Sequence, residues 1–446
     1  MQENKKNIIY ASSIVALTVI LGVLWFFIIQ STNQTSELTG GMSGASSNTS
    51  AAYSAAKDIT ASEDVDGGEF ASTNADENAI SVSGNITANL SNISVTKTGD
   101  SDGGDNTSFY GTNSAIIARN GAKLNIKNVT ISTDATGANG VFSYGGSATT
   151  NNNSSDGTTV NISDSTITTS KDNSGGIMTT GGGTMNATNL TVNTAGTSSA
   201  AIRSDRGGGT VVVEQGTYKT TGKGSPAIYS TADITVKNAS LIATASEGIV
   251  IEGKNSVALE NVNLEDTNNS LNGQSTTYKN IFLYQSMSGD AASGEAKFSA
   301  KDSSIITNQG DTFYVTNTTA TIDLENNQFT NNDVSGNFLR VKQDSWGKGG
   351  SNGGNVTMNL TNQTASGNIA VDAVSSLKLN LSTGSHFTGA INSSNEGEVS
   401  ISLDESSTFT LTGDTYVASL TNADETNSNI NLNGYKLYVG GTLWAE

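Results

Sequence analysis

From residue 78 onward, the chain repeats short runs in which apolar and polar residues alternate on both sides of a small polar residue. The clearest run is Leu124-x-Ile126-x-Asn128-Val129-x-Ile131. Alternation with a period of two predicts two short strands that each bury one face. The Asn between them predicts a corner, because Asn tolerates left-handed backbone angles and can bond to its own neighbours.

The same unit recurs along most of the chain. Its corner falls at Asn92, Asp164, Asn189, Asn238 and Asn261, and in looser copies at Gln215, Asp302, Asn326 and Asn362. A further short strand precedes each copy, and its inward residue recurs at intervals of 21 to 36 residues between residues 80 and 391. Constant strand motifs with a variable period predict loops of different length on a constant frame. We therefore predict a parallel β-solenoid with three strands per coil and about twelve coils.

Stacked coils would place the corner residues above one another. Side-chain amides in such a stack can each donate a hydrogen bond to the next, at about 1 kcal/mol net per bond. We expect a structural ladder of Asn92, Asn128, Asn189, Asn238, Asn261 and Asn326. The last segment is rich in aromatic residues, and we expect it to form a C-terminal cap from about residue 415.

Ahead of the repeat lies a run of 22 uncharged, mostly apolar residues, from Ile8 to Ile29. At about 1.5 Å per residue, a helix of this length crosses a bilayer core of roughly 30 Å. Lys5 and Lys6 precede the run, and no basic residue follows before Lys57. The positive-inside rule therefore predicts a cytoplasmic tail at residues 1–7 and an extracellular remainder. A cleaved signal peptide is the alternative, although its apolar region would be shorter.

Residues 30–76 are rich in Ser, Thr, Asn, Gly and Ala and contain few apolar residues. Such a composition buries too little surface to order the chain, which predicts a disordered stalk. The chain is thus expected to consist of a tail, a transmembrane anchor at residues 8–29, this stalk, and a β-helix over residues 77–446.

Charge and composition narrow the classes of partner. The chain has 22 basic and 41 acidic residues and a net charge of −19. This charge argues against nucleic acid as a partner, because phosphate backbones are bound by basic surfaces. The absence of cysteine excludes disulfides, zinc–thiolate sites and thiol catalysis.

The repeated unit around Asn128, with its lead-in Gly121-Ala122-Lys123-Leu124, resembles the pectate-lyase-like superfamily of right-handed parallel β-helices. The resemblance is closer to the adhesin-like and autotransporter-passenger-like branch, and to uncharacterised surface proteins of gut Gram-positive bacteria. It implies an all-β, right-handed parallel β-helix. It implies little about activity, because folds of this kind host several functions.

The enzymes of this superfamily are polysaccharide lyases and hydrolases, and the hydrolases use paired aspartates, a His and an Arg-Ile-Lys run. The segment Arg340-Val341-Lys342 resembles that run, but the paired aspartates are missing and the only His is His386. The acidic loop with Asp100, Asp102 and Asp105 does not match the spacing of a calcium loop. We therefore assign no catalytic residue, no metal ligand and no cofactor.

The outward positions of the first strand in each coil carry aromatic and aliphatic residues where a solvated face would carry Thr, Asn and Lys. Exposed apolar surface of this kind often marks a ligand site, and aromatic faces beside polar groups suit sugar rings. The candidate ligand-binding residues are Phe142, Tyr144, Arg203, Asp205, Tyr229, Glu252, Phe282, Tyr284 and Tyr314. In the alternative, a long loop such as 145–158 or 266–279 folds over this stripe and buries it.

The leading functional expectation is a membrane-anchored, adhesin-like extracellular protein without catalysis, which binds glycans or the surface of a host or neighbouring cell. A carbohydrate-active enzyme of the lyase-like group is the second hypothesis. A structural cell-surface component without a specific ligand is the third. Convergent carboxylates with shifted pKa values in a groove would favour the enzyme, and an open aromatic stripe would favour binding.

Overall fold

The computed structural model describes residues 51–101, 104–147, 155–273 and 275–445. The expected tail, membrane anchor and first part of the stalk, up to residue 50, lie outside these residues. Within the described part of the chain, no helix is both long enough and apolar enough to cross a membrane. Residues 51–446 make up one compact unit.

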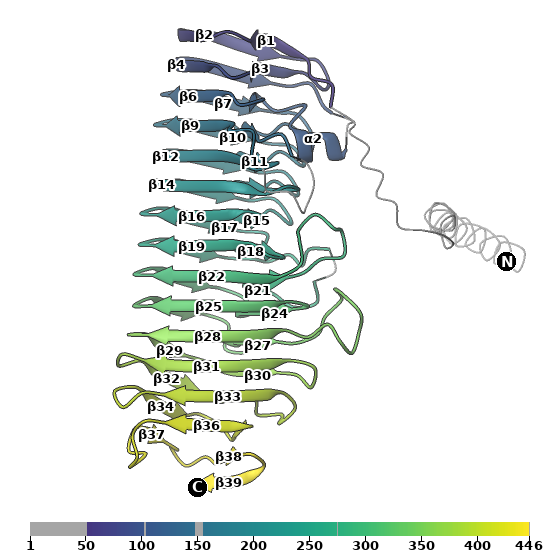
Figure 1. Cartoon of the computed structure of the whole chain (residues 1–446). Coiled ribbons are helices and arrows are strands. Elements are labelled where there is room, and N and C mark those ends of the chain that lie inside the picture. The colour runs from purple at the N-terminus through teal and green to yellow at the C-terminus, as the bar shows by residue number, and fades with distance from the viewer. Residues whose placement is uncertain (1–50, 102–103, 148–154, 274, 446) are drawn as a thin grey trace, which may run out of the picture. The chain divides into compact units, whose positions relative to one another are not determined.

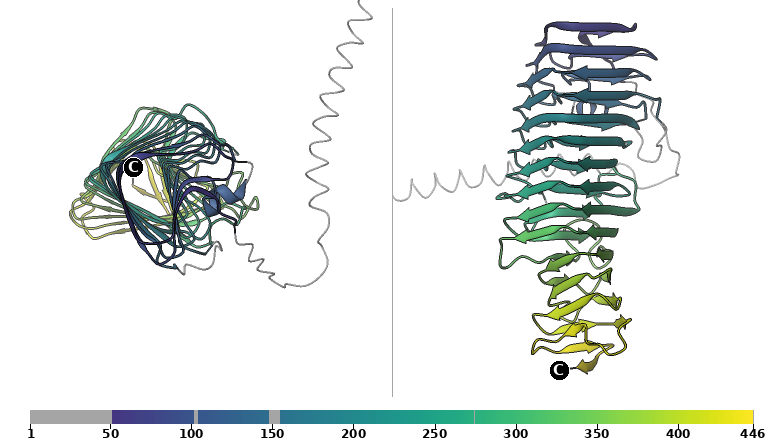
Figure 2. Two further views of the ribbon diagram at one scale, coloured as in Figure 1. Left: turned by 90° about the horizontal axis from the view of Figure 1, so that it is seen from above. Right: turned by 90° about the vertical axis from the view of Figure 1, so that its left-hand side faces the viewer.

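The unit is a stack of parallel strands (Figures 1 and 2). One flank is a twelve-stranded sheet, which we call sheet A. It contains β1 (Ala55–Ile59), β3 (Asn78–Ser83), β5 (Ile116–Arg119), β8 (Val141–Tyr144), β11 (Ile177–Thr180), β13 (Ile202–Ser204), β15 (Ile228–Ser230), β18 (Ile249–Glu252), β21 (Lys279–Tyr284), β24 (Asp311–Thr316), β27 (Leu339–Val341) and β30 (Ile369–Val371).

The other flanks belong to a large sheet and to two small sheets near the C-terminus. The large sheet contains β2 (Glu63–Ser72), β4 (Thr87–Lys97), β6 (Lys123–Lys127), β7 (Thr130–Thr133), β9 (Thr159–Ser163), β10 (Thr166–Thr169), β12 (Gly183–Thr194), β14 (Gly209–Thr220), β16 (Asp233–Lys237), β17 (Ser240–Ala243), β19 (Ser256–Glu260), β20 (Asn263–Asp266), β22 (Glu295–Lys301), β23 (Ser304–Thr307), β25 (Thr319–Glu325), β26 (Gln328–Asn331), β28 (Asn355–Thr361), β31 (Ser376–Ser382), β33 (Glu398–Leu403) and β36 (Ser419–Asn422). The small sheets contain β29 (Thr364–Ser366), β32 (His386–Gly389), β34 (Thr408–Leu411) and β37 (Ile430–Asn431), and β35 (Thr415–Val417), β38 (Leu437–Val439) and β39 (Thr442–Ala445).

The strands pair in parallel with their counterparts one coil later, except that β39 at the C-terminal end pairs antiparallel with β38. Ile116 of β5 faces Val141 of β8, and Leu124 of β6 faces Val160 of β9. These inward residues are fully buried and form one core that runs the length of the stack. The structure thus confirms the prediction of an all-β solenoid built from stacked parallel strands.

The solenoid begins earlier than the sequence pattern suggested. β1 pairs with β3, and β2 pairs with β4 from Glu63 to Ser72, so the second half of the predicted disordered stalk is the first coil. The strand pattern of this coil is hard to recognise in the sequence because β2 is rich in acidic residues. Asp64, Asp66 and Glu69 are exposed, and only Val65 and Phe70 pack against the core as apolar residues. Gly67 lies opposite the corner residue Asn92 and has a left-handed φ of 77°.

The corner residues have the backbone angle that the sequence analysis expected. Asn92, Asn128, Asn189, Asn238, Asn261 and Asn326 all have φ values between 52° and 56°. Asn128 donates to Asn92 at 2.6 Å, and Asn261 donates to Asn238 at 2.7 Å. The stack is divided into short runs, because Asp66, Asp164, Glu214 and Asp302 accept the bonds from Asn92, Asn189, Asn238 and Asn326. An ionised carboxylate accepts but cannot donate, so each run ends there.

A second ladder, which the sequence analysis missed, lies three residues before the corners. Asn89 donates to Asp64, Asn125 to Asn89, Asn161 to Asn125, and Asn186 to Asn161, at 2.5 to 2.9 Å. These residues occupy outward strand positions, where alternating polar residues are expected in any half-buried strand. Only the stacking register reveals that they form a row.

The ladder leads to a stability prediction at Asn238, which donates to Glu214 and accepts from Asn261. Asn238→Ala should lower the free energy of unfolding by about 2 kcal/mol, because it loses both bonds and forces alanine into a left-handed angle. Asn238→Gly should cost about 1 kcal/mol, because glycine tolerates that angle. Urea unfolding of both variants measures the difference. Equal losses would show that the corner angle contributes nothing.

Candidate functional site

The outward face of sheet A is largely covered. Phe142, Phe282, Tyr284 and Tyr314 are each at most 9% exposed. They belong to two apolar clusters, one with Ile117 and Met178 and the other with Val250. The prediction of an open aromatic stripe is therefore wrong. The stripe is covered, as in the alternative, but in the described part of the chain the covers are residues 105–110 and 342–354 and not the loops 145–158 and 266–279 suggested from the sequence.

The first cover is the short helix α2 (Asp105–Tyr110), which lies against the side of the stack (Figure 1). The ring of Tyr110 packs edge-on against Tyr144 at 5.6 Å, and Tyr53 donates a hydrogen bond to the Tyr110 carbonyl at 2.9 Å. Gly111 ends the helix with a φ of 70°, and a Cβ there would lie 2.7 Å from the ring of Phe142. Glycine is thus required where the cover meets the stripe, and burial raises the pKa of Tyr144 to about 12.

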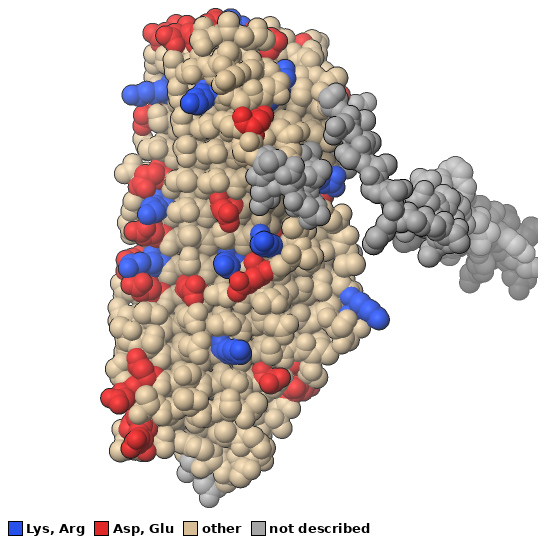
Figure 3. Space-filling model, viewed as in Figure 1, with Lys and Arg blue, Asp and Glu red and all other residues tan. Residues whose placement is uncertain are grey.

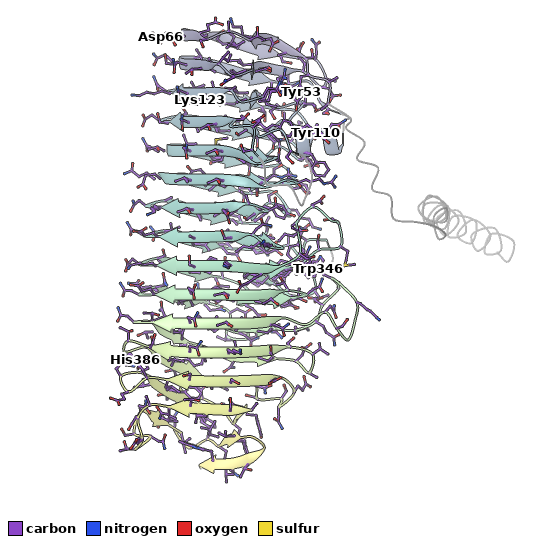
Figure 4. The ribbon with its side chains drawn as sticks, viewed as in Figure 1. Tyr53, Asp66, Tyr110, Lys123, Trp346 and His386 are labelled. Carbon is purple, nitrogen blue, oxygen red and sulfur yellow. The ribbon has the colours of Figure 1, made fainter. Side chains whose placement is uncertain are left out.

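The second cover is the loop that follows β27, at residues 342–354, which carries Trp346. The Trp346 ring lies 5.1 Å from Phe282 and 5.3 Å from Tyr284. Asn352 holds the loop by donating to the carbonyls of Asp344 and Trp346, at 2.7 and 2.5 Å. Tyr110 and Trp346 lie on the same side of the stack, opposite the side that carries Asp66 and Lys123 (Figure 4).

A cavity of about 520 Å³ lies on the outward face of sheet A, with walls from both covers. Its size falls within the range of small-molecule sites, roughly 300–1,000 Å³. β13 contributes Arg203, and Asp205 follows it; β15 contributes Tyr229; β21 contributes Phe282 and Tyr284. Phe109 of α2 and Trp346 of the second cover complete the aromatic part of the wall.

A buried ion pair lies in the wall of this cavity. Arg203 contacts Asp205 at 3.1 Å, and the two side chains are 11% and 9% exposed. Arg203 also donates to the carbonyl of Ser198 and to the hydroxyl of Ser108, at 3.2 and 3.3 Å. Burial raises the pKa of Asp205 to about 6, although Arg203 works in the opposite direction.

Two further ion pairs hold the loops around the cavity. Arg206 binds Asp290 at 2.7 Å, and its guanidinium lies over the Phe109 ring at 4.0 Å, so it joins α2 to the loop at residues 285–294. Lys279 is fully buried beside Glu247 at 3.5 Å, and burial lowers the pKa of this lysine. Figure 3, in the same view as Figure 1, shows positive and negative side chains along the left-hand edge of the stack, on the side away from α2.

Glu252 is a buried carboxylate that forms no ion pair with Lys or Arg in the described part of the chain. It accepts hydrogen bonds from Tyr229 and from Tyr284, the latter at 2.9 Å, and from Ser286 and Ser288. Burial raises the pKa of both tyrosines well above the ordinary value, so both phenols remain proton donors. Glu252 thus supports two aromatic walls of the cavity and anchors the loop at residues 285–294.

The structure separates the candidate residues into two groups. Arg203, Asp205, Tyr229, Phe282 and Tyr284 line the cavity, and Glu252 lies behind it. Phe142, Tyr144 and Tyr314 pack under the covers and are not in its wall. The wall also contains Phe109, Glu247, Asp290 and Trp346, which the sequence pattern did not indicate as site residues. Only Trp346, a lone Trp within a polar Gly-rich segment, offered a signal.

The other candidates for chemistry lie apart from this cavity. Arg340 pairs with Asp311 at 2.5 Å, and His386 is exposed with Nδ1 2.7 Å from the Thr408 hydroxyl. In the described residues, no group of three or more His, Cys, Asp or Glu side chains is placed to hold a metal ion.

Comparisons with protein-family models, curated proteins and solved structures find no match. The distinctive features of the cavity are an aromatic wall, a buried ion pair and a carboxyl group with a raised pKa.

Proposed function

We propose that the chain is a glycan-binding protein of the cell surface. The observation that carries the proposal is the cavity on sheet A, in which Tyr229, Trp346 and other aromatic side chains lie beside carboxylates and hydroxyls. Sugar rings present apolar C–H faces and polar hydroxyl edges, and sites that bind them combine aromatic faces with hydrogen-bonding groups.

The wider proposal follows the sequence pattern. The stacked parallel strands belong to a right-handed β-helix of the pectate-lyase-like superfamily, in its adhesin-like branch. Residues 8–29 anchor the protein in the membrane with the solenoid outside the cell. The partner is then a glycan on a host or neighbouring cell, and nucleic acid is disfavoured by the net charge of −19.

Tryptophan fluorescence of the full chain during glycan titration tests the proposal. A glycan array first identifies binding sugars, and saturation with one of them should then change the emission of Trp346. Trp346→Phe should abolish this change, because the reporter is in the cavity wall. Trp444→Phe is the matched control, since Trp444 is an exposed residue in β39.

A second variant tests the energetic role of the same ring. Trp346→Ala should weaken binding by about tenfold or more, which corresponds to about 1.4 kcal/mol. Trp444→Ala should leave the affinity unchanged. Binding that survives in Trp346→Ala with the parental affinity would place the glycan elsewhere and would favour a structural role for the cavity.

Glycan cleavage is a second candidate function, favoured by Asp205. Its carboxyl lines the cavity, and its pKa of about 6 would leave it protonated in mildly acidic solution, as a general acid requires. Release of reducing ends from the array ligands would then fall as the pH rises through about 6, and Asp205→Asn would abolish it. Binding without any release would leave the protein as a non-catalytic binder.

A further inference from the structure

A second cavity lies beside the first. Its volume is about 600 Å³, and it is formed by the turns that connect β13 to β14, β15 to β16 and β18 to β19, together with the loop at residues 285–294. Its wall carries no aromatic side chain and includes Asp233, Lys254 and Ser293.

The two cavities meet at Asp290, which lines both of them. Arg206 holds Asp290 at 2.7 Å and rests on Phe109 of the first cavity. Because Asp290 lies in the walls of both, the two cavities are neighbours on either side of this residue.

The direction of the combined cleft follows from the order of its lining residues along the chain. Pro226 precedes β15 and Tyr229 lies on β15, and both line the first cavity. Asp233, the first residue of β16, lines the second cavity. The cleft therefore runs with the strands, across the stack, and the chain from Pro226 to Asp233 spans at most about 23 Å.

We propose that the two cavities are successive subsites for one oligosaccharide chain, which crosses the solenoid parallel to the strands of sheet A. This inference rests on the proposed glycan binding and specifies its ligand. The aromatic first cavity holds one end of the chain, and the polar second cavity holds the sugars that follow.

The charges around the cleft indicate an uncharged chain. The two walls together contain five carboxylates and three cations, namely Asp205, Asp233, Glu247, Asp290, Glu295, Arg203, Lys254 and Lys297. Arg203 and Lys297 already face carboxylates, at 3.1 and 3.6 Å. Arg206 and Lys279 pair with the wall carboxylates Asp290 and Glu247, so in the described residues Lys254 is the only wall cation without an ion pair. A polyuronate would therefore meet few free positive charges, in a protein of net charge −19.

The experiment titrates the full chain by calorimetry with glucose-, mannose-, xylose- and N-acetylglucosamine-based series, each from monosaccharide to hexasaccharide. An oligogalacturonate series provides the acidic comparison. In at least one uncharged series, the hexasaccharide should bind about tenfold or more tightly than the monosaccharide. The oligogalacturonates should bind more weakly at every length.

Ser293→Trp provides the local test, because Ser293 is exposed on the wall of the second cavity and a Trp there fills it. The variant should lose the gain with chain length and keep the monosaccharide affinity. Ser393→Trp, the same change at a distant exposed position, should bind like the parent. Binding without length dependence, a length dependence that survives Ser293→Trp, or a preference for oligogalacturonates would overturn the two-subsite inference alone. The absence of binding by every series would overturn the glycan proposal with it.

Discussion

Arg203→Ala should lower the free energy of unfolding by about 3–5 kcal/mol, the usual cost of leaving one partner of a buried ion pair alone. Arg203 and Asp205 are 11% and 9% exposed, so without the guanidinium the Asp205 carboxylate has little hydration apart from what the adjoining cavity supplies. Lys301→Ala is the matched control. It breaks the pair of Lys301 with Glu325, which is about half exposed, and should cost no more than about 1 kcal/mol.

The loss in Arg203→Ala should depend on pH. The pKa of Asp205 is raised from 3.8 to about 6 in the folded protein, which therefore binds this proton more tightly than the unfolded chain does. The stability from that proton is present below pH 4 and is lost as the pH rises through about 6. Arg203 stabilises Asp205 only when Asp205 is ionised, which in the folded parent is above about pH 6. The variant should therefore be most destabilised at pH 7–8 and less so near pH 5. A loss under 1 kcal/mol at both pH values would contradict the burial of the pair.

Glu252→Ala should lower the free energy of unfolding by about 2–5 kcal/mol. It leaves the hydroxyls of Tyr229 and Tyr284 without their shared acceptor, and an unsatisfied buried donor costs about 1–3 kcal/mol. The same variant should weaken glycan binding, because both rings line the cavity and the loop at residues 285–294 loses its anchor.

Glu252→Gln is the matched control. It keeps one acceptor oxygen in nearly the same volume, so it should cost about 1 kcal/mol and retain binding. Denaturant unfolding and glycan titration of both variants measure the two effects. If alanine and glutamine were equally stable, the four hydroxyl bonds to Glu252 would not hold the site together.

The repeating frame could be predicted because its signal is local. Leu124, Ile126 and Ile131 alternate with polar residues, and Asn128 marks the corner, so one coil already defines its strands. Stacking then follows, because a single coil cannot bury its apolar residues alone and does so against neighbouring coils of the same pattern. The first coil escaped notice because β2 carries acidic side chains outside and only two partly buried apolar residues, Val65 and Phe70, inside.

The site could be predicted only in part. The alternating pattern places Tyr229, Phe282 and Tyr284 on the outward face of sheet A, but their exposure depends on segments distant in sequence. Phe109 and Trp346 reach the cavity from loops of irregular length, and no periodicity constrains where such loops fold. On an open stripe, changing both Tyr229 and Tyr284 to Ser would leave the stability unchanged. Because both side chains pack in a covered cluster, the double change should destabilise the protein.

A crystal structure of the protein with the oligosaccharide that binds most tightly would show where the glycan lies. We expect sugar density in the first cavity, between Tyr229 and Trp346, that continues past Asp290 over the turns after β15 and β18. Density on another face, or an empty first cavity at saturating ligand, would contradict glycan binding in this cleft.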